Sequence, residues 1–463
     1  MEMTSEELFY NKKPGFDKTD WDKASAYAEG YKTFLDIGKT ERDAVSAIVN
    51  IAYEGGFEPY RRGMELKPGD RIYCVNREKG VALAVIGEDS LANGIHLTAA
   101  HLDAPRIDIR TVPLYEQEGM AFFKTHYYGG LKKYQWTAIP LELRGVVCVC
   151  RNGKMLKMKV SIGADPSDPK FVITDLLPHL ASKQMQEKMV DGIKAENMNV
   201  LIGSRPSDTV DEKCSDKIKL AILEHLNHKY GMTEVDFLSA ELSCVPAFNA
   251  CDIGFDRTMV GAYGHDDRVC AYPAATALMS IEGTPKTTSV CLLVDKEEIG
   301  SDGVTGMQSR FFDTFMADLC RSQDVYPEVC YENSVCLSTD VCNAFDPNYA
   351  EVSEPRNDAR VNCGFALMKY SGARGKSGTS DASAELMARV RLILDGAGIP
   401  WQTAQLGRVD QGGGGTVAMY LANRNIDTVD AGVPVLSMHA PFEVISKVDL
   451  YSAFLGMKAF YEA

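Results

Sequence analysis

The sequence predicts an α/β fold with a β-rich block inserted into the chain. Strand-like apolar runs alternate with helical patterns in both terminal parts, whereas residues 107–244 carry short stretches of alternating polarity. In addition, five segments place side chains of the metal-ligating type at the ends of apolar strands. Strand ends of an open α/β sheet meet at one edge, where ligands bind.

Size and composition limit the class of protein. A chain of 463 residues exceeds one ordinary hydrophobic core, so we expect two domains. The net charge of -15 argues against nucleic acid or an anionic membrane as a partner. Thirteen scattered cysteines without a CxxC pair indicate reduced thiols. No signal peptide or membrane-spanning segment is recognisable, so we expect a cytoplasmic protein.

The first part of the chain begins with two helical patterns, at residues 21–37 and 40–53. Thr40 and Asp43 predict a capping box at the start of the second, with Asp in place of Glu. Strands are expected at residues 71–75, 81–86 and 95–100.

The middle of the chain has a different pattern. Stretches such as FFKTHYYGG and KMLKMKVSIGA predict antiparallel strands and hairpins, and a polar section at residues 182–216 indicates loop and helix. We therefore expect a discontinuous domain of residues 1–106 and 245–463, and an inserted domain of residues 107–244.

The alternation of strands and helices returns after this block. Helical patterns cover residues 271–281, 309–320, 382–394 and 447–462, and strand-like runs cover residues 288–294, 334–338, 361–370, 403–406 and 433–438. Four glycines at 412–415 predict a tight loop at a helix start. Without a GK[ST] continuation they indicate a nucleotide site only weakly.

Glu297 and Glu298 follow a buried apolar strand at the expected ligand-binding edge. Two carboxylates there repel each other and lose hydration, which a metal ion would compensate. Four other segments have the same character. One contains His101 with Asp103, one contains Asp266 with Asp267, one contains Asp340 and one contains His439. Each alone also fits a cap, a turn or a buried histidine. Five such coincidences at strand ends are much less frequent.

The residue types define the chemistry. Zn²⁺ binds imidazole nitrogen and carboxylate oxygen, and a catalytic site leaves a position for water. Two metals about 3.5–4 Å apart need a bridging carboxylate, terminal ligands and a separate base. Two histidines, two aspartates and one glutamate supply five ligands, and one glutamate remains as the base. This count fits a two-metal hydrolase.

The motifs HLDAP, HDDR, DKEEIGS, STDVCNAFDPNY and LSMH resemble, in order, those of the aspartyl aminopeptidase family of dinuclear zinc exopeptidases. THYYGGLKKYQW and DLLPHLA resemble further segments of that family. The resemblance implies a zinc-exopeptidase-like mixed sheet flanked by helices, an inserted β-rich dimerisation domain, and dimers assembled into a dodecamer.

The resemblance also implies roles for single residues. His101 and Asp340 would bind one metal, Glu298 and His439 the other, and Asp266 would bridge the two. Asp103 would orient the His101 ring, and Glu297 would be the general base. His179 would reach the active site of a neighbouring subunit. The metals would be two Zn²⁺ ions, with Co²⁺ or Mn²⁺ as alternatives.

The chain departs from the family pattern at several positions. Asn343 and Asp346 stand where histidines are usual, Asp267 replaces an asparagine, and MKYSGARGKSGT replaces the substrate segment, with Lys369 kept. We therefore expect an aminopeptidase acting on peptides, and its preference for N-terminal Asp or Glu rests on Lys369. The alternatives are a dinuclear amidohydrolase acting on acylated amino acids and a catalytically silent, shell-forming protein of the same fold.

Overall fold

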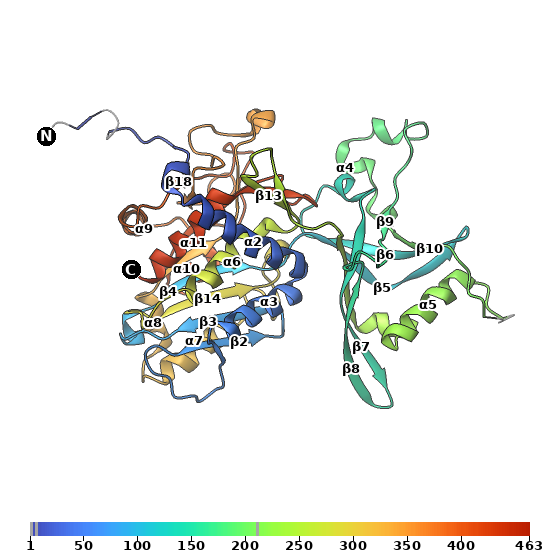
Figure 1. The fold of residues 1–463 in the computed structure, drawn as a ribbon, viewed down its shortest axis with the longest axis horizontal. Coiled ribbons are helices and arrows are strands. Elements are labelled where there is room, and N and C mark those ends of the chain that lie inside the picture. The colour runs from blue at the N-terminus through green and yellow to red at the C-terminus, as the bar shows by residue number, and fades with distance from the viewer. Residues whose placement is uncertain (1–2, 5–7, 210–212) are drawn as a thin grey trace. The chain divides into compact units, whose positions relative to one another are not determined.

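The computed structural model describes residues 3–4, 8–209 and 213–463 (Figure 1). By its internal contacts the chain divides into two compact units. Unit 1 comprises residues 1–103, 250–438 and 442–463, and unit 2 comprises residues 104–249 and 439–441. The expected domain limits at residues 107 and 244 stay a prediction, because compactness does not test independent folding.

Unit 1 contains a nine-stranded mixed sheet in the order β1-β2-β3-β14-β4-β15-β19-β17-β18. Its strands are β1 Glu58–Pro59, β2 Arg71–Asn76, β3 Gly80–Val85, β4 His96–His101, β14 Ser289–Val294, β15 Val335–Thr339, β17 Phe365–Met368, β18 Trp401–Thr403 and β19 Asp427–Gly432. The central strands β14, β4, β15 and β19 run parallel to one another. Their carboxyl ends therefore lie along one edge.

Helices cover both faces of this sheet (Figure 1). They are α2 Trp21–Ile37, α3 Glu41–Glu54, α6 His265–Met279, α7 Phe311–Arg321, α8 Pro327–Glu332, α9 Ala384–Gly396, α10 Ala418–Ala422 and α11 Lys447–Tyr461. Helices α2, α3, α6, α9 and α11 contribute to the core on one face, and α7, α8 and α10 to the core on the other.

Strand β14 shows why the sequence gives this layered arrangement. All six residues are buried, and successive side chains enter opposite cores, with Leu293 in one and Leu292 in the other. A continuous apolar run is what a parallel strand covered on both faces requires.

A second, five-stranded sheet in unit 1 has the order β12-β13-β21-β20-β16. Its strands are β12 Cys251–Ile253, β13 Met259–Ala262, β16 Cys342–Asn343, β20 Pro434–Leu436 and β21 Glu443–Ser446. Strand β13 leads into α6, and β16 follows β15. This sheet therefore anchors two of the segments that carry candidate ligands.

Unit 2 is built on a seven-stranded sheet in the order β8-β7-β11-β5-β6-β10-β9. Its elements are β5 Arg106–Gln117, β6 Met120–Tyr128, β7 Leu141–Arg151, β8 Lys154–Ile162, β9 Val172–Ile173, α4 Met189–Gly192, β10 Val200–Gly203, α5 Lys217–Tyr230 and β11 Ala240–Pro246. Asn152 and Gly153 connect β7 to β8 with positive φ values of 52° and 72°. Such values are typical of a tight hairpin turn.

The structure confirms the α/β fold class and most expected elements, with three corrections. The strand expected at residues 403–406 is wrong, because β18 ends at Thr403. The section 182–216, in which no strand was expected, contains β10, and α5 was missed. Thr40 does cap α3, since its side chain accepts the Asp43 N–H. Among the described residues, no helix is both long and apolar enough to cross a bilayer.

Candidate metal centre

The candidate site lies where strands β14, β4 and β15 end side by side. His101 is the last residue of β4 and is level with Val294, the last residue of β14. Asp340 follows the last residue of β15. Three segments far apart in the chain thus present ligand-type side chains at one edge of the sheet, as expected for a doubly wound fold.

The turn after β14 is held by the carboxylate of Asp103. The backbone N–H of Glu297 donates to Asp103 Oδ1 at 3.1 Å, and the N–H of Glu298 donates to Oδ2 at 3.2 Å. Lys296 and Gly300, with φ of 70° and 97°, flank the short 3₁₀ turn Glu297–Ile299. Asp103 therefore fixes the position of both glutamates from the end of β4.

Asp103 also fixes the ring of His101, which is 1% exposed. Nδ1 of His101 lies 3.0 Å from the Asp103 carbonyl oxygen and 3.2 Å from Asp103 Oδ1, so Nδ1 carries a proton and donates it. The other ring nitrogen, Nε2, lies 3.1 Å from Asp266 Oδ1 and 3.8 Å from Asp340 Oδ1. This is the orientation that a carboxylate gives to a metal-binding histidine.

The electrostatics of this edge favour a cation. Burial alone would lower the pKa of His101, but hydrogen bonds to Asp103 and Asp266 outweigh it and raise that pKa well above its ordinary value. Burial, together with neighbouring carboxylates, raises the pKa of Asp340 well above its usual range. Without a metal, a proton on Nε2 compensates the excess negative charge of these carboxylates. A metal ion bound at Nε2 would compensate the same charge.

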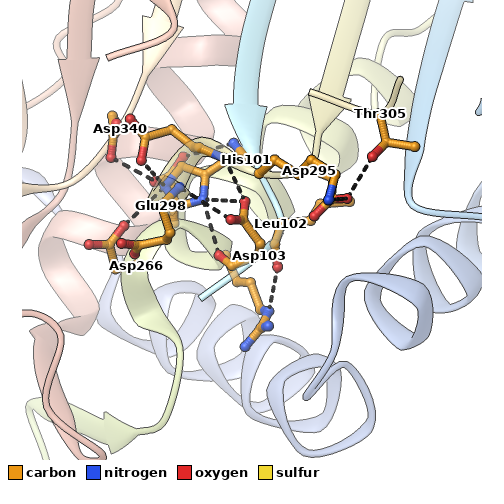
Figure 2. Close-up of polar contacts among 12 residues, drawn as sticks. His101, Leu102, Asp103, Asp266, Asp295, Glu298, Thr305 and Asp340 are labelled. Atoms are coloured by element: carbon orange, nitrogen blue, oxygen red, sulfur yellow. Dashed lines mark hydrogen bonds and ion pairs between the residues drawn. The ribbon is translucent and has the colours of Figure 1, made fainter. Parts of the chain in front are cut away.

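The ligand atoms form two overlapping groups. One contains His101, Glu297 and Asp340, and the other contains His101, Asp266 and Glu298; within each group the atoms lie within 4.8 Å of one another. Figure 2 shows His101, Asp266, Glu298 and Asp340 converging, with Asp103 beside them. An imidazole and four carboxylates are the donor set that Zn²⁺ accepts, so these residues fit the metals inferred from the sequence.

Asp267 differs from its neighbour Asp266. It belongs to neither ligand group, and its Oδ2 accepts the backbone N–H of His101 at 3.4 Å. Complete burial raises the pKa of Asp267 well above its ordinary value. This geometry makes Asp266, and not Asp267, a candidate ligand, and the bridging role of Asp266 stays a prediction.

Two residues that sequence reasoning missed support the site from behind. Glu443 is 1% exposed, and its Oε2 accepts the backbone N–H of Asp266 at 3.1 Å. Arg268, also 1% exposed, donates from Nε to the Leu102 carbonyl at 3.1 Å. Charged residues within apolar surroundings in HDDRVCAY and APFEVIS were the available signals.

Four of the nine candidate residues lie outside the two ligand groups: Asp103, whose contacts are given above, and three others, His439, His179 and Lys369. His439 belongs to unit 2, where its Nδ1 donates to the Gly130 carbonyl at 2.6 Å, which leaves the lone pair on Nε2. His179 is an exposed residue of unit 2. Lys369 forms an ion pair with Asp381. The functions expected of these three stay predictions.

The position of Lys369 follows from strand direction. Strand β17 runs antiparallel to β19, and Ala366 is level with Gly432 at the carboxyl end of β19. Lys369 follows β17, so its backbone lies away from the edge where β4, β14 and β15 end. Only its long side chain could extend toward the site.

Taken together, a buried histidine and four carboxylates at the carboxyl edge of an α/β sheet define a metal-dependent hydrolase. Comparison with known proteins agrees. The family model described as Aminopeptidase I zinc metalloprotease (M18) matches residues 34–461, so the chain belongs to the M18 family of zinc metallo-aminopeptidases. It is therefore a peptidase.

Individual relatives are similar over nearly their whole length. A probable M18 family aminopeptidase 1 of Clostridium acetobutylicum is 44% identical, with 96% of this chain and 97% of that protein aligned. The crystal structure of an M18 aminopeptidase from Thermotoga maritima has a TM-score of 0.93 at 40% identity, covering 98% of this chain and 100% of that one. The mApe1 dodecamer of S. cerevesiae shares the fold, with a TM-score of 0.76 at 18% identity. The alignment covers 94% of this chain and 96% of the mApe1 chain.

Proposed function

We propose that this aminopeptidase releases N-terminal residues from peptides with two divalent metal ions and with Glu297 as the general base. The observation that supports two ions is the number of donors, since four carboxylates gather around His101 and one Zn²⁺ takes about four ligands in all. His101, Asp266, Glu298 and Asp340 would hold them, together with His439. When bound, such ions polarise the scissile carbonyl and lower the pKa of a water molecule.

The protein groups then carry the protons. Glu297 would accept a proton from the attacking water and deliver it to the leaving amine, because its carboxylate is held at the site by a fixed turn. Its Oε2 lies 3.9 Å from His101 Nε2. Asp103 keeps the proton of His101 on Nδ1 throughout, so Nε2 stays available as a ligand atom.

An anilide panel tests the proposed reaction. The protein as purified, with its metal content measured, should hydrolyse amino-acid anilides and lose this activity with a chelator. Hydrolysis of N-acylated amino acids in preference to free-amine anilides would support the amidohydrolase alternative instead. No hydrolysis of either with metal bound would support the silent, shell-forming alternative.

We also propose a preference for N-terminal Asp or Glu, with Lys369 as the cation that would bind the side chain. Its ion pair with Asp381 must open for this contact, which reduces the net discrimination. Lys369→Met should lower kcat/KM for Asp-anilide about tenfold while sparing Leu- and Ala-anilides. Equal losses on all three would indicate broad specificity.

We further propose that the chain forms homo-oligomers, dimers assembled into a dodecamer, with unit 2 at the interface. Exposed apolar side chains gather in its segment 176–190, namely Leu176, Leu177, Leu180, Met185, Met189 and Val190. The related mApe1 is a dodecamer. Light scattering would give the assembly size. The thirteen free thiols support a reducing, cytoplasmic location.

A further inference from the structure

A groove of about 920 Å³ lies on the sheet face covered by α7, α8 and α10. It adjoins a smaller, more apolar cavity of about 380 Å³ lined by Tyr60, Phe311 and Phe315. Arg62 and Asp318 line both spaces. The groove lies outside the candidate metal centre, and its volume is in the range of about 300–1,000 Å³ found for small-ligand sites.

The lining of the groove is rich in guanidinium groups, those of Arg62, Arg310, Arg321 and Arg424. Three carboxylates, of Asp313, Asp318 and Glu328, leave a net positive charge in a chain whose total is -15. A cationic concavity on an acidic protein attracts anions by focusing the field.

The pairing of these arginines shows which of them are available. Arg424 is fully engaged, since it donates to Asp313 Oδ1 at 2.6 Å and to the Ser309 carbonyl. Arg62 and Arg321 share one carboxylate, that of Asp318, at 2.8 and 3.0 Å. Two guanidinium groups on one carboxylate leave a positive charge uncompensated there.

Arg310 completes the excess of positive charge. It is exposed, and in the described part of the chain its guanidinium has no hydrogen-bond or ion-pair partner. A purely structural role explains Arg424, which ties α10 to α7 and the loop before it. A structural role does not explain Arg310, because its guanidinium connects no two elements among the described residues. Planar guanidinium groups bind carboxylate and phosphate oxygens in pairs.

We propose that this groove is an anion-binding site, in which Arg310, Arg62 and Arg321 bind a carboxylate or phosphate group. The anion has two chemical sources, a free small anion or an acidic side chain farther along a peptide substrate. The second source rests on the proposed function and is favoured by position. Gln308 and Tyr420, in the groove lining, both contact the carbonyl of Gly300, which ends the turn of Glu297 and Glu298.

Calorimetric titration of the metal-loaded protein with inorganic phosphate tests the site without reference to activity. Arg310→Gln and Arg321→Gln should each weaken phosphate binding by about tenfold. Arg391→Gln is the matched control, because Arg391 is exposed on α9 and lines neither cavity. If phosphate binds the parent and both groove variants with equal affinity, the phosphate is bound at the metal centre and not in the groove.

A kinetic comparison distinguishes the sources. The peptides Ala-Ala-Asp-Asp-Asp and Ala-Ala-Gly-Gly-Gly are compared with Ala-anilide. If the source is the substrate, Arg310→Gln lowers kcat/KM for the acidic peptide about tenfold and spares the other two. If Arg310→Gln weakens phosphate binding but leaves the kinetics on both peptides unchanged, the ligand of the groove is a free small anion. Unchanged phosphate binding together with equal kinetics on both peptides overturns the proposal, while retained anilide hydrolysis leaves the proposed function standing.

Discussion

Glu297 and Glu298 are adjacent in the chain, yet they belong to different ligand groups. Glu297 is grouped with His101 and Asp340, and Glu298 with His101 and Asp266. In a 3₁₀ turn with about three residues per turn, successive side chains point roughly 120° apart. One turn can therefore present neighbouring carboxylates to two positions. The same geometry leaves two roles open to Glu297, ligand or base, which substitution separates.

Glu297→Gln should keep the metal content of the protein and lower kcat by about 10²–10⁴-fold, because an amide cannot accept a proton. Glu298→Gln should instead reduce the bound metal, since Glu298 would be a terminal ligand. Metal analysis beside anilide hydrolysis checks both variants. Loss of one metal from Glu297→Gln would make Glu297 a ligand and leave the base unassigned.

Asp103→Asn should weaken metal binding by about 10–100-fold, although we assign no metal contact to Asp103. The carboxylate accepts the N–H groups of Glu297 and Glu298 and faces the protonated Nδ1 of His101. In the asparagine, the NH₂ group would face one of these N–H groups, and two donors cannot form a hydrogen bond. Competition with a metal-chelating dye measures the affinity. An affinity equal to the parent's would show that the turn and the ring are fixed without Asp103.

At the scale of elements, most strands of the central sheet could be predicted, whereas the short strands β10 and β21 could not. Strands β4, β14 and β15 were expected from their apolar runs, and with them the meeting of His101, Glu298 and Asp340. Strand β21, only four residues long, carries Glu443 to the Asp266 backbone through pairing with distant β13. Such a contact depends on tertiary pairing, which leaves no period in the local sequence.

The close approach of β19 to the end of β15 gives an element-level prediction. A Cβ at Gly432 would stand 1.7 Å from the Asp340 carbonyl oxygen. Gly432→Ala should therefore displace the strand end that carries Asp340 and lower the free energy of unfolding by at least about 1–3 kcal/mol. Urea denaturation measures this change, and metal analysis should show a parallel loss of bound metal.

Gly396→Ala is the matched control for that substitution. Gly396 ends α9, and a Cβ there would meet nothing within 4 Å. Alanine should leave the stability unchanged or raise it by up to about 1 kcal/mol, because glycine is a poor helix former. If both variants unfolded like the parent, the backbone near Asp340 would be able to yield, and the packing argument would be wrong.

At the scale of the whole molecule, His96 links the central sheet to two helices. Arg389 of α9 donates to its Nε2 at 3.1 Å, and its Nδ1 lies 3.4 Å from the carbonyl of Tyr461 at the end of α11. An imidazole that accepts from arginine must be neutral. Burial, in the main, together with the charge of Arg389, lowers the pKa of His96 to about 4.

This pKa predicts how stability depends on pH. The unfolded chain binds the proton at its ordinary pKa near 6.5 and the folded chain only near 4, so stability is lost as pH falls through this window. The largest loss from this residue is about 3 kcal/mol. Urea denaturation at pH 7 and pH 5 should show a smaller pH effect for His96→Gln. His228→Gln, at an exposed position of α5, should behave as the parent.

The last prediction concerns the proposed contribution of His179 to a neighbouring subunit. His179→Ala and Glu297→Gln should each be nearly inactive, because each removes one component of the same site. If that site takes Glu297 from one subunit and His179 from its partner, a randomly mixed dimer of the two variants contains one intact site. Co-expression should then restore about a quarter of the parent activity, by the pairing statistics of an isologous dimer. The control is a mixture of the two variants that were assembled separately. Their subunits do not exchange, so this mixture should stay inactive. Co-expressed protein that is no more active than the average of the two variants would place His179 in its own subunit's site or outside any site.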